Sequence, residues 1–162
     1  MIERVVHPYQ LEKALSHVIA NKGSAGVDGI SVREIRKIFT EKKLQFIEQI
    51  KTEKYQVQPI LGIEIPKGNG KTRLLGIPTT TERVLQQSVA QNLAPLFEPE
   101  FKPNSFGFRP NKNARQAVGQ AREYIHQGLN HIVDTDLKNF FDEVDHCLLL
   151  NLVYQKVKCK TT

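Results

Sequence analysis

The chain has 162 residues, a length that suits one domain or one lobe of a larger protein. With 40% hydrophobic and 25% charged residues it has the composition of a soluble globular protein, and no run approaches the roughly 18 apolar residues of a membrane-spanning helix. The net charge of +6 fits a polyanionic partner and a solvated basic surface equally well.

The cysteines and the N-terminus bear on the compartment. Cys147 and Cys159 lack the CxxC spacing of a zinc site, and their small number argues against a disulfide scaffold. The first residues, Met1 to Arg4, carry no signal-peptide pattern. A reducing, cytoplasmic location without a membrane partner is therefore expected.

The N-terminal third is predicted to be helical. Apolar residues at helical spacing predict a helix over 9–20, which stops at Asn21-Lys22-Gly23. A glycine-rich loop over 23–29 follows. Ser31 and Glu34 then have the spacing of a capping box, which predicts a second amphipathic helix with Leu44, Ile47 and Ile50 on its apolar face.

Residues 57–77 predict a strand, a turn at Asn69-Gly70 and a second strand. A three-residue loop over 68–70, with Gly70 left-handed, would pair Ile65 with Arg73 and put Lys67 and Arg73 on one face. A two-residue turn would put these two cations on opposite faces. Gly70-Lys71-Thr72 is not a phosphate-binding P-loop, because Ile65 stands where that motif needs its first glycine.

The second half continues the α+β pattern. Thr79 and Glu82 predict the start of a helix that runs to Phe97, and a loop over 99–111 follows. A helix is expected from Ala114 to Ile125, a short strand over 131–136 and a last helix over 147–157. The order of helices, hairpin, helices, strand and helix is α+β rather than a regular βαβ alternation.

Two acids on the expected short strand, Asp134 and Asp136, would share one face because side chains alternate along a strand. They are either solvated or placed against a cation, and magnesium suits an oxygen-only site. On spacing alone the solvated strand end is the more common arrangement. The basic hairpin tip likewise suits either solvation or phosphate binding.

Four segments in order resemble one known family. They are Gly26 to Gly29, the hairpin residues Ile65-Pro66-Lys67 with Arg73 to Pro78, Ser105 to Pro110, and Asp134 to Asp142. Together they resemble the N-terminal half of a group II intron-encoded reverse transcriptase, also called a maturase, over about residues 21–150. The resemblance implies helical fingers with a β-hairpin over 1–98, including an N-terminal extension. It implies the start of a reverse-transcriptase palm over 99–162.

The resemblance assigns roles at the reaction centre. Asp136 resembles the catalytic aspartate that holds Mg²⁺, with the backbone carbonyl of Leu137 as a further metal ligand. Phe141 or Phe140 resembles the aromatic gate that excludes a 2′-hydroxyl from the incoming sugar. Lys67 and Arg73 resemble the fingers pair that grips the triphosphate.

It also implies nucleic-acid partners: RNA template or intron RNA, a DNA primer and a dNTP. The residues that would contact nucleic acid are Gly26, Asp28, Arg109, Lys112 and Arg115.

The sequence departs from the family where the second catalytic element would be. There is no Tyr-x-Asp-Asp turn and no Asp-Asp pair, and later palm, thumb and maturase segments are not seen. A truncated nucleotidyltransferase, which binds RNA and dNTP but is inactive alone with weak or no Mg²⁺ binding, is therefore expected. The rival hypothesis is a non-catalytic RNA-binding module. Exposed palm surface is a candidate for homodimerisation, carried by Leu148, Leu149, Leu152 and Val153.

Overall fold

The computed structural model describes residues 1–66 and 68–159, apart from the Asn69 side chain. The chain divides into two compact units, residues 1–94 and a second unit that starts at Pro95, and each is described by itself. The elements are helices and one two-stranded antiparallel sheet, which confirms the predicted α+β class. Among the described helices, none has the length and apolar character needed to cross a membrane.

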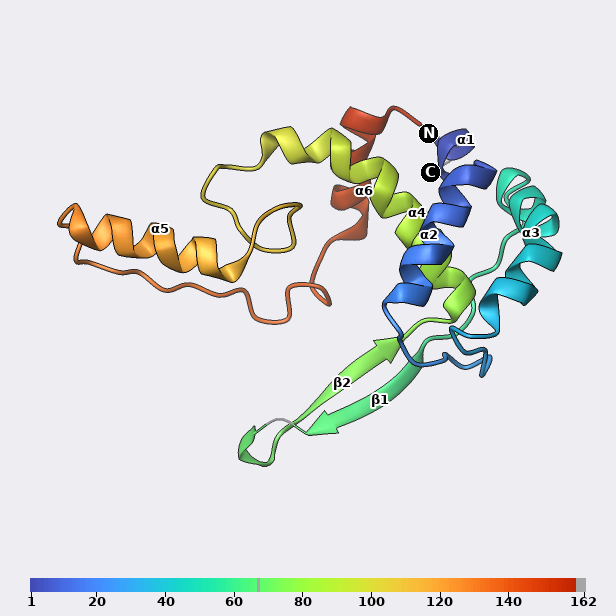
Figure 1. The fold of residues 1–162 in the computed structure, drawn as a ribbon, viewed down its shortest axis with the longest axis horizontal. Helices are drawn as coiled ribbons and strands as arrows, with labels where there is room; N and C mark the ends of the chain where they lie inside the picture. The colour runs from blue at the N-terminus through green and yellow to red at the C-terminus, as the bar shows by residue number, and fades with distance from the viewer. Residues whose placement is uncertain (67, 160–162) are drawn as a thin grey trace. The chain divides into compact units, whose positions relative to one another are not determined.

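The core of the first unit is built by three helices. They are α2 (Pro8–Ala20), α3 (Ile35–Lys51) and the first part of α4 (Thr80–Phe97), while the short α1 (Ile2–Val5) precedes them (Figure 1). The predicted apolar stripe of the first long helix is confirmed. The buried cluster contains Leu11, Ala14, Leu15 and Val18 from α2, Ile35, Phe39 and Phe46 from α3, and Val84 from α4.

The apolar face of α3 differs from the prediction at one position. Ile47 and Ile50 pack against the core as expected, but Leu44 is 78% exposed. Leu44 lies two residues before the buried Phe46, which is about 200° around a helix of 3.6 residues per turn. The core-facing stripe is set by the aromatic residues Phe39 and Phe46, and Leu44 faces away from it.

The hairpin has the register of the three-residue loop. Strand β1 (Leu61–Pro66) pairs with β2 (Thr72–Ile77), and Ile65 lies opposite Arg73. The connecting turn, η1 (Gly68–Gly70), ends with Gly70 at φ 70°. The two-residue alternative is therefore wrong, since it would have shifted the pairing by one residue.

The first strand begins at Leu61, later than the predicted Val57. The ladder ends where β2 ends, at Ile77, and the next residue is Pro78, which has no N–H to donate. The backbone N–H of Gln58 is used elsewhere, in a hydrogen bond to the Glu82 carboxylate. Residues 57–60 therefore precede the strand rather than extend it.

The N-termini of two helices in the first unit were predicted from Ser/Thr-x-x-Glu spacing. At α4, the Glu82 N–H donates to Thr79 Oγ1 at 3.3 Å and the Thr79 hydroxyl donates to Glu82 at 3.2 Å, so the predicted partners are confirmed. Before α3, Glu34 accepts from the Ser31 N–H at 3.1 Å and from the Ser31 hydroxyl at 2.6 Å. These bonds lower the pKa of Glu34. The Ser31 hydroxyl donates to Glu34 instead of accepting from the helix N-terminus, while the Ser31 carbonyl accepts from the Glu34 and Ile35 N–H groups at 3.1 Å, and the helix starts after this turn.

The second unit contains the end of α4, a short turn η2 (Glu98–Glu100), α5 (Ala114–His126) and α6 (His146–Val157). Both predicted helices are confirmed. Asn113 and Gln116 form a capping box on α5, with bonds of 3.0 and 2.9 Å. Asp145 caps α6 by accepting from the Leu148 N–H at 3.0 Å.

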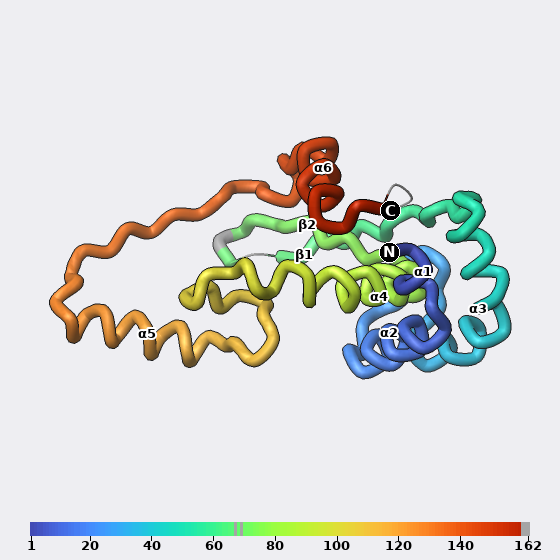
Figure 2. Tube along the Cα trace, turned by 90° about the horizontal axis from the view of Figure 1, so that it is seen from above, coloured from blue at the N-terminus to red at the C-terminus, as the bar shows by residue number. Residues whose placement is uncertain are grey.

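The predicted strand over 131–136 is wrong. Figure 2 shows a drawn-out trace between α5 and α6, but the described residues contain no strand there. Val133 is 87% exposed, and no described segment pairs with this stretch. A strand exists only with a hydrogen-bonded neighbour, and the apolar pattern of Ile132 and Val133 cannot supply one by itself. The shared face of Asp134 and Asp136, which rested on strand alternation, loses its basis.

Candidate nucleotide and nucleic-acid sites

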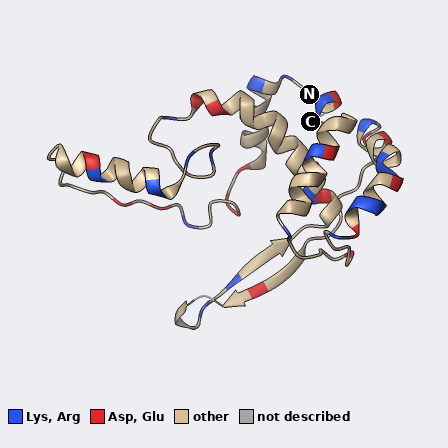
Figure 3. Cartoon of the chain, viewed as in Figure 1, with Lys and Arg blue, Asp and Glu red and all other residues tan. Residues whose placement is uncertain are grey.

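Arg73 projects from one face of the hairpin. Because side chains alternate along a strand, Arg73 shares its face with Ile65, Ile63 and Leu75. The opposite face carries Glu64. Within the described residues, the Arg73 guanidinium makes no ion pair or side-chain hydrogen bond, so its donors remain open to a ligand. Figure 3 shows that Lys and Arg also follow α3 and α5.

Lys67, the predicted partner of Arg73, lies outside the described residues. The same-face arrangement of this pair therefore stays a prediction, which the confirmed register at Ile65 and Arg73 supports. Alignment of the fingertip with Asp136 also stays a prediction, because the hairpin and Asp136 belong to different units.

Asp136 lies in exposed, irregular chain just before a turn over 138–142, and together they surround one open hollow. The hollow is lined by Thr135 to Leu137 and by Asn139 to Asp142. Asn139 adopts a left-handed φ of 52°, and its carbonyl accepts from the Asp142 N–H at 3.0 Å. The turn thus brings the aromatic pair Phe140 and Phe141 to the same hollow as Asp136, with ring centroids 5.6 Å apart. Asp134 does not line it.

The donor set at this hollow is oxygen-based but incomplete for a metal. Asp136 Oδ1 accepts from the Leu137 N–H at 2.9 Å, which leaves its second oxygen open. No group of three acidic, histidine or cysteine side chains fit to hold an ion occurs in the part of the chain that the structure describes. Mg²⁺ needs only one or two carboxylates, because it keeps waters and borrows substrate phosphates. Asp136 and the Leu137 carbonyl therefore fit part of such a shell.

The loop that contains Gly26 is packed against the start of α4. Gly26 is buried, and a Cβ on it would lie 2.7 Å from Thr79 Cα. The Arg83 guanidinium donates to the Ser24 carbonyl, and the Thr80 hydroxyl donates to the Ile30 carbonyl at 2.7 Å. A glycine is required at position 26 because helix and loop backbones meet there. Asp28 Oδ1 accepts from the Ile30 N–H at 3.2 Å.

Arg109 holds its own loop together. Its guanidinium donates to Glu98 at 2.7 and 3.0 Å and to the carbonyls of Lys102 and Ser105 at 2.8 and 2.9 Å. It also lies over the Phe101 ring, and the side chain is only 10% exposed. Sequence reasoning missed the Glu98 partner, since Glu98 lies eleven positions before Arg109 and no regular helix or strand spacing relates the two.

The other two basic residues predicted on this side are less enclosed. Lys112 Nζ donates to the Pro103 carbonyl at 3.3 Å and lies 5.1 Å from the Phe106 ring centroid. Arg115 is exposed in the first turn of α5. Nucleic-acid contact by Arg109, Lys112 and Arg115 stays a prediction, and Arg109 has the fewest donors left for it.

Comparison with known proteins decides the family. The sequence profile described as "Reverse transcriptase (RNA-dependent DNA polymerase)" matches residues 65–162, more than half of the chain. This chain belongs to the reverse transcriptase family. Its family is therefore that of RNA-directed DNA polymerases, as the four segments between Gly26 and Asp142 predicted.

Relatives of this reverse transcriptase chain include intron-encoded proteins. It is 33% identical to the group II intron-encoded protein LtrA of Lactococcus lactis subsp. cremoris, over 90% of this chain and 24% of LtrA. It is 26% identical to protein YkfC of Escherichia coli strain K12, over 97% of this chain and 43% of YkfC. A putative COX1/OXI3 intron 2 protein of Saccharomyces cerevisiae is 30% identical, over 86% of this chain and 16% of that protein. These matches confirm the group II intron resemblance, and the chain spans less than half of each relative.

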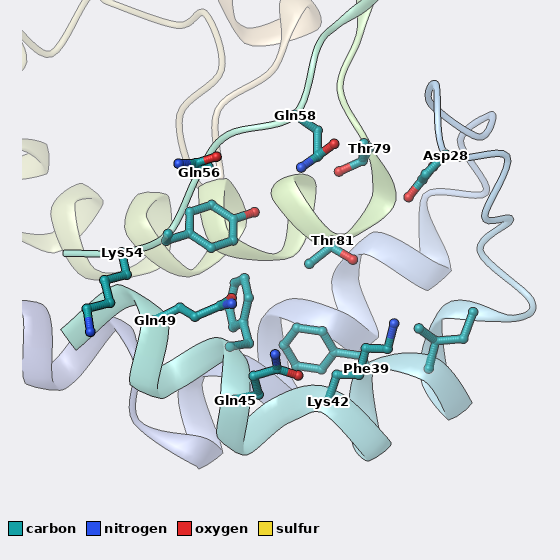
Figure 4. Close-up of a pocket in the computed structure, with 13 residues that line it drawn as sticks. Asp28, Phe39, Lys42, Gln45, Gln49, Lys54, Gln56, Gln58, Thr79 and Thr81 are labelled. Atoms are coloured by element: carbon teal, nitrogen blue, oxygen red, sulfur yellow. The ribbon is translucent and has the colours of Figure 1, made fainter. Parts of the chain in front are cut away.

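The reverse transcriptase chain also has a pocket that sequence reasoning missed. It lies in the first unit, between α3, the segment before β1 and the first turn of α4, with a volume of about 440 Å³ (Figure 4). The one available signal was the density of glutamines between positions 45 and 58. The polar lining comprises Asp28, Lys42, Gln45, Gln49, Lys54, Gln56, Gln58, Thr79 and Thr81.

Proposed function

We propose that this chain supplies the fingertip triphosphate contact and one metal-binding carboxylate of an RNA-directed DNA polymerase of the group II intron type, and that it binds RNA template. The observation that carries the proposal is the hairpin register at Ile65 and Arg73. In this register the Arg73 guanidinium has no internal partner among the described residues. Arg73 also lies within residues 65–162, which match the reverse transcriptase profile.

In this proposal Arg73 and Lys67 grip the triphosphate of the incoming dNTP. A guanidinium forks onto phosphate oxygens through two N–H groups, while an ammonium acts as a compact charge. Both stabilise the negative charge that develops on the phosphates during transfer. A rigid two-stranded ladder is a suitable support, because positioning contributes much of the rate in phosphoryl transfer.

Asp136 and the Leu137 carbonyl would hold Mg²⁺, which when bound supplies activation of the primer hydroxyl and stabilisation of the pyrophosphate leaving group. The exposed ring of Phe141, or that of Phe140, then lies beside the carboxylate and excludes a sugar 2′-hydroxyl by its bulk. Template RNA is held through phosphate contacts by Arg115 and Lys112, with the loop of Gly26 and Asp28 and with Arg109 as further contacts.

A non-catalytic RNA-binding module is the second candidate. It is favoured by the incomplete donor set around Asp136, since no three-residue metal cluster is found within residues 1–66 and 68–159.

Two assays on the purified chain test the proposal. Binding of fluorescein-labelled single-stranded RNA should weaken steeply as salt rises, because phosphate contacts release counterions. Arg73→Ala should weaken binding of a dNTP to the chain–RNA complex more than it weakens binding of RNA, whereas the reverse order would favour the RNA-binding module. RNA binding that is absent, or insensitive to salt, would contradict both candidates. Primer extension by the chain alone should be undetectable.

A further inference from the structure

The pocket beside α3 has an unusual set of unused hydrogen-bonding groups. Gln45 and Gln49 reach it from α3, and Gln56 and Gln58 from the segment that leads into β1 (Figure 4). Across residues 1–66 and 68–159, none of these four side-chain amides has a hydrogen-bond partner. Each amide offers a donor and an acceptor side by side.

The base of the pocket is apolar and well packed. Phe39 and Phe46 are 3% and 6% exposed, and their ring centroids lie 5.3 Å apart at an interplanar angle of 64°. Tyr55 packs edge-on against Phe46 at 5.2 Å and 84°. A flat ligand would therefore meet aromatic surface below and amide groups around its edge.

The wall opposite α3 is fixed by a buried carboxylate. Glu82 accepts from the Gln58 N–H and from the Thr79 hydroxyl and is 3% exposed. Burial and, to a lesser extent, this carboxylate raise the pKa of Tyr55 to about 12, so its hydroxyl stays protonated. The buried groups Phe39, Phe46, Thr79 and Glu82 thus fix the base and one wall of the pocket, while the glutamines at its rim are exposed or half-buried.

Charge at the pocket is unevenly distributed. Lys42 and Lys54 both line it, and Figure 4 shows Lys54 at one end and Asp28 at the other. Among the described residues, neither lysine has an ion-pair partner. Two free ammonium groups suit a ligand that carries a phosphate.

We infer that this pocket binds one unpaired nucleobase together with its phosphate. Glutamine amides match the paired donor and acceptor groups on a base edge, as they do for adenine N6 and N7. Unpaired bases are recognised by exposed edges and aromatic contact, and Lys42 or Lys54 would hold the adjoining phosphate. The site lies in the first unit and includes neither Arg73 nor Asp136, but it shares Asp28 with the proposed template contacts. For an RNA strand the inference therefore rests on the proposed function, and for a mononucleotide it goes beyond it. The nucleotide belongs either to an RNA strand or to a free mononucleotide.

The test compares ligands that differ only in the base. Affinity of the whole chain is measured by fluorescence anisotropy for a short single-stranded RNA with a central adenosine and for the same RNA with an abasic site there. The intact RNA should bind roughly tenfold more tightly, because stacking and edge contacts are lost from the abasic strand. Gln49→Ala and Gln56→Ala should each reduce this ratio, and Gln86→Ala, on α4 outside the pocket, should leave it unchanged.

Calorimetry with adenosine 5′-monophosphate and ribose 5-phosphate shows whether the bound nucleotide belongs to an RNA strand or is a free mononucleotide. If adenosine 5′-monophosphate binds more tightly than ribose 5-phosphate, and Gln49→Ala abolishes this difference, the pocket is a mononucleotide site. If a preference for the base is seen only between the intact and abasic RNAs, the pocket is a site for an RNA strand. Lys37→Ala, which removes an exposed charge elsewhere on α3, should weaken the binding of the intact and the abasic RNA by the same factor. Equal binding of the intact and abasic ligands in both assays, or a ratio unaffected by both glutamine variants, would overturn the inference. If neither RNA binds, the proposed function fails, while the mononucleotide pair still tests the pocket.

Discussion

The buried carboxylate of Glu82 accepts a hydrogen bond from the backbone N–H of Gln58, 24 positions earlier in the chain. The same carboxylate accepts from the Thr79 hydroxyl at the start of α4. One side chain therefore joins the segment that enters β1 to the helix that follows β2. Both ends of the hairpin are fixed to one point, which gives the fingertip a rigid base.

Replacing Glu82 by Ala should destabilise the chain by about 1–3 kcal/mol, because it removes the acceptor of the Gln58 N–H and of the buried Thr79 O–H. Urea unfolding followed by circular dichroism measures the change. Glu41→Ala, at an exposed position on α3, is the control and should stay within about 0.5 kcal/mol of wild type. Equal stabilities of the two variants would show that the Glu82 bonds contribute nothing.

Gly26→Ala should also be destabilising, by about 1–3 kcal/mol, because the new methyl group would meet the Thr79 backbone and force loop and helix apart. The matched substitution is Gly119→Ala in α5, where a Cβ meets nothing within 4 Å. That change should stabilise the chain by about 0.5–1 kcal/mol, since alanine is the better helix former. Opposite shifts in midpoint denaturant concentration are therefore expected, and two shifts of the same sign would contradict the packing described for Gly26.

Arg109→Lys tests whether the positive charge of Arg109 or its forked hydrogen bonds stabilise the loop. The lysine keeps the positive charge but cannot reproduce the forked bonds to Glu98 and to the carbonyls of Lys102 and Ser105. A loss of about 1–3 kcal/mol in unfolding free energy is expected. Arg115→Lys, on the exposed side of α5, should unfold like wild type. If instead the Arg109 variant were as stable as wild type and only RNA binding fell, its main role would be contact with nucleic acid.

The raised pKa of Tyr55 predicts a change in stability at alkaline pH. The unfolded chain loses the phenolic proton near pH 10 or so, whereas the folded chain keeps it up to about pH 12. Between these values the unfolded state binds fewer protons, so stability falls as pH rises. Unfolding free energies measured from pH 9 to 12 or so should fall less steeply in Tyr55→Phe than in wild type, whereas Tyr9→Phe, at an exposed position, should follow wild type. Parallel curves for all three would contradict the burial of the Tyr55 hydroxyl.

Local patterns predicted the parts of this fold that local chemistry determines. The stripe of Leu11, Ala14, Leu15 and Val18 fixed the buried face of α2. The glycines around Asn69 predicted a hairpin turn but allowed two registers, and the structure has the one that sets Arg73 opposite Ile65. The family of the chain could likewise be predicted from its four motif segments, because the residues in those motifs are determined by chemistry rather than by packing.

Features that depend on distant partners could not be predicted in the same way. The stretch over 131–136 has the composition of a strand, yet strand formation depends on a neighbour, and none is present among the described residues. Leu44 matched a helical period, but the aromatic residues Phe39 and Phe46 determined which face is buried. The glutamine-lined pocket needed the tertiary contact between Glu82 and Gln58, which no short window of sequence contains.

Asp136 is the position on which the polymerase account depends. The direct measurement is primer extension on an RNA template by a polypeptide that contains this sequence together with a Tyr-x-Asp-Asp palm segment, in the presence of Mg²⁺. Asp136→Ala should lower the rate by at least about a hundredfold, as expected for loss of a group that stabilises the transition state. Asp134→Ala, two residues away and outside the hollow, should retain most of the activity. Extension by the Asp136 variant at the wild-type rate would contradict the account.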